Sequence, residues 1–284
     1  MFTRSIKQAI AAAFVIGAGY GAVANAAPAI GFDPTGTGTY SYYADTLTND
    51  TDSALALGFN PFAVVGFPGA THAPYDTQLI AQTNVNALTL NGVQQLAIGP
   101  ASGFEITKVT SFSERVTLQL GSTFVAWTQP GAVQPDIDGA TAGSQQLMIF
   151  FDPTPDSNPN TSGGYTDGIL ILSARIADVL SSFAVNPLNP TVGTGAFRID
   201  YIIDYVNANY LDLVSGSILT DVLQGNSNIP ALYNPPTMWD GTPSAQGIIM
   251  RIDSSENFLV PEPGTLALVG LALLGAGALN RKRS

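Results

Sequence analysis

Short apolar segments separated by glycine, proline and asparagine recur along the middle of the chain. The clearest pair is Ala87–Leu90 and Val93–Ile98, which flank Asn91 and Gly92. An Asn-Gly pair between two apolar runs accepts the positive φ angles of a type I′ turn, so this stretch predicts a β-hairpin.

Further segments have the composition or the two-residue alternation of strands. Val116, Leu118 and Leu120 fall on one side of the segment 114–120. A continuous apolar run from Gln145 to Phe151 is typical of a buried strand. The remaining strand predictions are Thr39–Tyr43, Phe104–Thr110, Thr123–Trp127, Ala196–Val206 and Gln246–Ile252.

Two segments fit either secondary structure. Residues 168–183 match a helical stripe and a strand equally well, and we predict a strand to about Ala177 because β patterns surround it. Residues 210–223 fit a short helix or a further strand. Many short strands between turn residues argue for a sandwich or a barrel. We predict an all-β fold, specifically an antiparallel β-sandwich or a jelly-roll-like body over residues 27–258.

The amino terminus has the three parts of a secretory signal peptide. Arg4 and Lys7 precede an apolar stretch from Ala9 to Val23, and Ala24-Asn25-Ala26 gives a small-x-small cleavage site. We predict a signal peptide over residues 1–26 and a mature start at Ala27, because cleavage after Ala27 would place Pro28 next to the scissile bond. An uncleaved anchor is the alternative.

The carboxyl terminus also has three parts. Pro261-Glu262-Pro263 forms a stiff, non-helical leader. Thr265–Leu279 is uncharged and, as a helix, would be roughly 22 Å long, short of a bilayer core of about 30 Å. Arg281, Lys282 and Arg283 follow and should stay on the cytoplasmic side. The segment predicts a transmembrane helix suited to temporary anchoring.

This tail resembles the PEP-CTERM sorting signal, on the Pro-Glu-Pro motif, the Leu/Ala/Gly-rich helix and the basic end over residues 259–284. The resemblance implies export in a Gram-negative bacterium that makes exopolysaccharide, transient insertion in the inner membrane, and removal of the tail by an exosortase. An ordinary membrane anchor is the alternative. More loosely, the body resembles flocculation-associated proteins of this class, through Phe32–Gly36, Tyr165–Gly168, and Ile252-Asp253 with Phe258.

Removing both terminal segments makes the charge strongly negative. The chain has 10 basic and 21 acidic residues. Half of the basic ones lie in the terminal segments, leaving Lys108, Arg115, Arg175, Arg198 and Arg251. Such a body should repel nucleic acid and attract cations or basic partners. Cysteine is absent, which excludes disulfides, thiol catalysis and thiolate metal sites.

Few residues suggest catalysis, so we predict that the protein is not an enzyme. His72 is the only histidine, and no Gly-x-Ser-x-Gly motif occurs. Glu105 and Glu114 lie in strand patterns, where we expect a solvated face, although carboxylate pairs of the glycosidase type stay open. We expect Trp127 in the core. Trp239 should be buried under its loop, with sugar stacking as the alternative.

One acidic stretch has the spacing of a calcium loop. Oxygen-bearing side chains occur at its first, third, fifth and twelfth positions, namely Asp156, Asn158, Asn160 and Asp167. Thr161 stands where such a loop needs glycine, and Asp167 replaces the usual bidentate glutamate. A polar turn capped by Asp and Asn is the alternative. Asp136 and Asp138 form a second, weaker acidic turn.

Taken together, these features predict an exported protein with a structural or adhesive role at the cell surface or in the polysaccharide matrix. Its expected partners are signal peptidase, an exosortase and exopolysaccharide, and no cofactor is expected besides a candidate calcium ion. A lectin-like sugar-binding module and a secreted glycan hydrolase remain alternatives.

Overall fold

The computed structural model describes residues 30–58, 75–116, 123–124, 128–130, 134–137, 145–186, 189–213, 218–226 and 233–259. The predicted signal peptide, His72, Trp127, Asp138 and the tail beyond Leu259 lie outside these residues. Within the described part of the chain, no helix has the length and apolar character needed to cross a membrane.

Strands dominate the described residues. The main sheet contains the long strands β5 (Tyr75–Leu90), β7 (Glu105–Val116), β11 (Ile169–Asn186), β12 (Asn189–Val206), β14 (Ile218–Asn226) and β15 (Ile248–Leu259). Its shorter members are β3 (Thr46–Asn49), β4 (Asp52–Leu57), β6 (Val93–Ala97), β8 (Thr123–Phe124), β9 (Thr128–Pro130) and β10 (Leu147–Asp152). The prediction of an all-β fold is confirmed.

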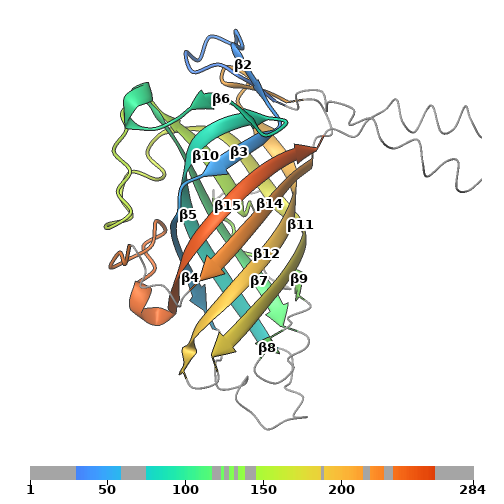
Figure 1. Cartoon of the computed structure of the whole chain (residues 1–284), viewed down its shortest axis with the longest axis vertical. Coiled ribbons are helices and arrows are strands. Elements are labelled where there is room, and N and C mark those ends of the chain that lie inside the picture. The colour runs from blue at the N-terminus through green and yellow to red at the C-terminus, as the bar shows by residue number, and fades with distance from the viewer. Residues whose placement is uncertain are drawn as a thin grey trace, which may run out of the picture.

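The main sheet closes into an up-and-down barrel (Figure 1). Its strands pair antiparallel in the ring β4–β5–β7–β10–β11–β12–β14–β15, and β15 returns to β4. Strand β3 continues the position of β4, since both pair with β5 and β15. The predicted sandwich was wrong: one continuous set of ladders joins these strands, and closure leaves no pair of separate sheets.

Bulges in the long strands allow this closure. The register between β11 and β12 shifts between Ser173 and Ala174 and again between Ile176 and Asp178. Each shift bends and twists the strand locally. A two-residue alternation cannot predict such shifts, so the sequence leaves sandwich and barrel unresolved.

The Asn-Gly hairpin is confirmed. Asn91 and Gly92 have φ angles of 51° and 74°, and β5 and β6 pair on either side of them. A separate sheet of β1 (Ile30–Phe32), β2 (Tyr42–Ala44) and β13 (Leu211–Leu213) lies at this end of the barrel (Figure 1). Two 3-10 turns, η1 (Pro100–Ser102) and η2 (Ser244–Gln246), are the helical elements of the described residues.

Both ambiguous segments are strands where the structure describes them. Residues 169–183 of the first segment lie in β11, which continues to Asn186, beyond the predicted end at about Ala177. The segment 210–223 contains β13 and the start of β14. The strands predicted separately at 104–110 and 114–120 belong to one strand, β7, which ends at Val116. Tertiary pairing therefore extends the strands beyond the local apolar runs.

Alternate residues of each strand fill the barrel. Phe112, Phe197, Ile199, Leu219 and Ile252 belong to one continuous buried cluster. Two smaller clusters lie outside the barrel wall, where the segments 153–168 and 233–247 cover one side (Figure 1). Their central residues are Val109, Met148, Phe150 and Tyr165 in one cluster, and Leu55, Ile80 and Met238 in the other.

Candidate functional site

A lysine is fully buried inside the barrel. Lys108 lies on β7 with the same parity as Ile106 and Phe112, so alternation directs it inward. Its Nζ donates to Asp221 Oδ2 on β14 at 2.9 Å and to Ser254 Oγ on β15 at 3.0 Å. It also forms a close ion pair with Glu256. An ammonium group has three donors, so all three are used.

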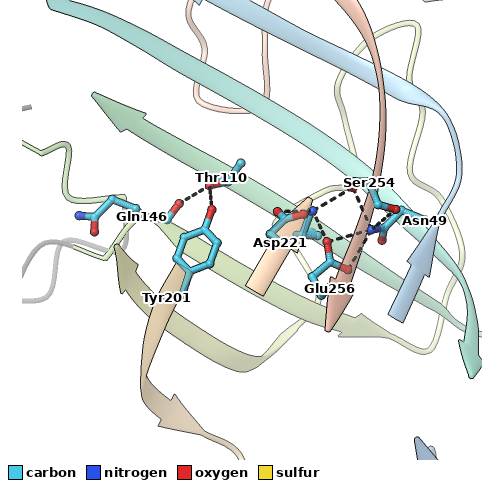
Figure 2. Close-up of polar contacts among 8 residues, drawn as sticks. Asn49, Thr110, Gln146, Tyr201, Asp221, Ser254 and Glu256 are labelled. Atoms are coloured by element: carbon cyan, nitrogen blue, oxygen red, sulfur yellow. Dashed lines mark hydrogen bonds and ion pairs between the residues drawn. The ribbon is translucent and has the colours of Figure 1, made fainter. Parts of the chain in front are cut away.

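Asn49 completes this lysine cluster, which comprises Asn49, Lys108, Asp221, Ser254 and Glu256 (Figure 2). The Asn49 amide on β3 donates to both Glu256 carboxylate oxygens at 2.9 Å and to Ser254 Oγ at 2.9 Å. The five residues come from β3, β7, β14 and β15. The cluster therefore links β3 and β7, from the first half of the chain, to β14 and β15, the last two strands of the barrel.

A second set of buried hydrogen bonds lies next to the lysine cluster and begins farther along the same strand, β7. Thr110, two residues after Lys108, donates to the Gln146 carbonyl at 2.7 Å. The Tyr201 hydroxyl of β12 lies 3.1 Å from Thr110 Oγ1 (Figure 2). The Gln146 side chain bonds the backbone at Pro135 and Ile176. These bonds fasten β7, β12 and the segment before β10.

Burial sets the charges of the lysine cluster. Desolvation raises the pKa of Asp221 to about 7, against the lowering effect of Lys108. Desolvation lowers the pKa of Lys108, but the Asp221 and Glu256 carboxylates raise it above its usual value. A catalytic amine needs a depressed pKa. This cationic, fully enclosed lysine is suited to stabilising the barrel rather than to nucleophilic chemistry.

The predicted calcium loop forms an acidic turn on the outer side of the barrel. Carboxylate oxygens of Glu105, Asp152 and Asp156 lie within 4.8 Å of one another, close enough to share a cation. Glu105 also accepts from the Asp156 and Ser157 N–H groups at 3.1 and 3.0 Å. The nearby Asp167 carboxylate raises the pKa of Asp156.

The four predicted calcium ligands form two pairs with different roles in the structure. Asp156 and Asp167 lie close enough to interact electrostatically. Asn158 instead caps the turn: its Oδ1 accepts from the Asn160 N–H at 2.9 Å, and its backbone bridges to Gly163. The polar-turn alternative accounts for this pair. Glu105 and Asp152 were missed because their proximity to Asp156 depends on the pairing of β7 with β10.

The burial of the other candidate residues can be compared with the predictions. Glu105 and Glu114 are 7% and 4% exposed, so the expected solvated face was wrong for both. Trp239 packs against both outer clusters but is only half-buried, so the expected burial under its loop holds in part. Asp136, of the second acidic turn, is exposed.

The three short segments that carried the looser resemblance lie at packing positions. Phe32 and Tyr165 are fully buried, and Ile252 and Phe258 belong to the barrel core. Gly168 passes so close to Phe151 that a Cβ would lie 2.7 Å from the Phe151 carbonyl oxygen. These residues build the fold.

The last strand of the barrel leads directly into the carboxyl-terminal segment, since β15 ends at Leu259. Residues 259–283 match the family model of the PEP-CTERM protein-sorting motif. No curated protein and no solved structure matches the chain. The sorting motif indicates a protein that is exported across the inner membrane to the cell surface and processed by an exosortase-type membrane enzyme.

Proposed function

We propose that this protein is a structural or adhesive component of the cell surface or of the extracellular polysaccharide matrix. The observation that carries the proposal is the sorting motif, joined without a linker to the closing strand of the barrel. Proteins sorted in this way operate outside the cell, where a closed sheet is an advantage because it has no free edge to aggregate. Flocculation or biofilm formation linked to exopolysaccharide is the proposed role.

The outer wall supports an adhesive role. Ile202 on β12 and Ile218 on β14 are opposite each other and are 42% and 44% exposed. Leu180 on β11 is also exposed. Surface ion pairs of Arg175 and Arg198 accompany these apolar side chains. Such a mixed wall offers both apolar and polar contacts to a hydrated polymer.

We favour binding over catalysis. Lys108 has no access to solvent, and the Glu105 carboxylate accepts hydrogen bonds from Asp156 and Ser157. A calcium-dependent sugar-binding module is the second candidate, favoured by the acidic turn of Glu105, Asp152 and Asp156. Exopolysaccharide binding with calcium and with a chelator separates the two, since simple adhesion through the outer wall should not need the ion.

A clean deletion in the native host tests the adhesive role. Loss of floc or biofilm with unchanged exopolysaccharide yield is the expected result. Complementation with wild type should restore aggregation, whereas a chain lacking residues 261–284 should not. Unchanged aggregation in the deletion strain, or a matching fall in polysaccharide yield, would argue against a direct adhesive role.

Fractionation tests the sorting route separately. The exported protein should begin at Ala27 and lack the segment after Pro-Glu-Pro. Glu262→Ala should leave the full-length chain in the membrane fraction, because the processing enzyme loses the carboxylate between the two prolines. An extracellular protein that retains Arg281-Lys282-Arg283 would show that the tail is a plain anchor.

A further inference from the structure

A small pocket lies inside the barrel near the end opposite the β1–β2–β13 sheet. Its volume is about 40 Å³, enough for on the order of three water-sized spheres. Most of the lining surface is apolar and includes Leu79, Phe197 and Met250, while Thr77, Gln78 and Ser181 also line the pocket. These side chains come from β5, β11, β12 and β15, so strands of the barrel wall form the pocket.

One acidic residue belongs to the lining of this pocket. Glu114, six residues beyond Lys108 on β7, lines the pocket and is 4% exposed. Its Oε2 accepts a hydrogen bond from Ser181 Oγ at 2.7 Å. Its Oε1 is buried and has no hydrogen-bond partner among the residues that the structure describes. A buried unpaired oxygen costs about 1–3 kcal/mol, so the site is incomplete without a donor.

The contrast with Lys108 indicates what the missing donor is. Inside the same barrel, Asp221 and Glu256 both accept a hydrogen bond from one ammonium group that the chain itself supplies. Glu114 is in an equally buried position but has no ion pair with any described cation, since the four arginines of the described residues bond elsewhere. A charge-assisted bond to a cation is the strongest completion of such a site.

We infer that this pocket binds a small primary alkylammonium ion, with its ammonium group on Glu114 Oε1 and its alkyl chain against Leu79, Phe197 and Met250. The pocket volume limits the chain to a few carbon atoms. The acidic protein as a whole, with a formal net charge of −11, raises the local concentration of cations. The site is separate from the outer wall and from the acidic turn.

Calorimetric titration of the full-length protein with n-butylammonium chloride at about pH 8, above the raised pKa of Glu114, tests this inference, with 1-butanol as the neutral probe of equal length. Wild type should bind the ammonium at least tenfold more tightly than the alcohol. Glu114→Gln should lose this preference while keeping the shape of the side chain. Asp76→Asn is the matched control because it removes a carboxylate that is exposed and paired with Arg115. That variant should bind like wild type.

A cavity-filling variant gives an independent test. Ala56 lines the same pocket, and Ala56→Leu should abolish binding without altering Glu114. Thermal unfolding of each variant checks that it folds. Equal affinity of wild type for the two probes, or equal ammonium binding by wild type and Glu114→Gln, would overturn the inference. Absence of binding to wild type would show that the pocket holds water alone.

Discussion

The lysine cluster and the acidic turn each bring carboxylates close together, but different groups compensate the negative charge in the two regions. Inside the barrel, Asp221 and Glu256 face Lys108, and all three are fully buried. At the turn, Glu105, Asp152 and Asp156 gather without an ion pair to any described lysine or arginine. Backbone N–H groups donate to Asp152 and Glu105 at the turn instead.

This difference separates a fixed charge balance from an exchangeable one. The lysine cluster carries its own cation and cannot lose it without unfolding. The acidic turn is open to solvent through Asp156, so an external cation can enter and leave. We therefore assign stability to the first region and ion dependence to the second, and the predictions below test that assignment.

Removing the buried cation should have the largest effect. Lys108→Met leaves two carboxylates in the barrel without their partner, and breaking a buried ion pair costs about 3–5 kcal/mol. The free energy of unfolding, measured by urea titration, should fall by that amount. Adding Asp221→Asn and Glu256→Gln should recover much of the loss, because the orphaned charges are then gone. A loss below about 1 kcal/mol in the single variant would contradict the assignment.

Raising the pH should destabilise the barrel in steps, one for each buried carboxyl group whose pKa is raised. Desolvation raises the pKa of Asp52, of Glu114 and of Asp221 to about 7, so the folded state holds more protons than the unfolded state between roughly pH 5 and 7. Stability is greatest below that range and is lost as the pH rises through about 7. Each group contributes up to about 3 kcal/mol.

Glu114→Gln isolates one of these contributions. It should reduce the loss of unfolding free energy between about pH 5 and pH 8 by on the order of 2 kcal/mol, leaving the part due to Asp52 and Asp221. Denaturant titrations at the two pH values measure this. Stability that is equal at both pH values in wild type would contradict the proton linkage.

Local patterns predicted the strands well and the long-range contacts poorly. The Asn91-Gly92 turn and the apolar run before Asp152 carry their structure in adjacent residues. Closure of the barrel depends on β15 meeting β3 and β4, which are some two hundred positions earlier in the chain. No local periodicity encodes that pairing.

The same distinction applies to the candidate sites. The spacing of Asp156 and Asp167 made the acidic turn visible, although its partners Glu105 and Asp152 come from paired strands. The lysine cluster joins residues 113 and 148 positions apart. One signal was available: Lys108 shares the inward parity of Ile106 and Phe112 in an otherwise uncharged stretch. A charge at such a position implies a buried partner, but not which one.

Calcium should stabilise the protein modestly through the acidic turn. With the affinity of about 1 mM typical of extracellular modules, about 10 mM calcium would add roughly 1.4 kcal/mol. Thermal unfolding should shift upward in wild type and not in Asp156→Ala/Asp167→Ala. Asn158→Ser is the matched control, since Asn158 caps the turn instead of facing the carboxylates. An equal shift in the double variant would assign the effect to general screening of the acidic surface.

The smallest effect is expected where a cation is lost from the outer wall. Arg198 pairs with Asp200 at 3.4 Å, and its side chain is 60% exposed. Water can solvate both groups once the pair is broken, and exposed pairs contribute about 0.2–1 kcal/mol. Asp200 also keeps its hydrogen bond from Thr220 at 2.7 Å. Arg198→Met should therefore lower the unfolding free energy by about 0.5 kcal/mol or less, in the same urea titration as Lys108→Met.

Both substitutions replace a cation facing carboxylates with methionine, so the ratio of the two losses isolates burial as the cause. Similar losses would show that the lysine cluster is no more important than a surface pair, and the contrast between fixed and exchangeable charge balance would fail.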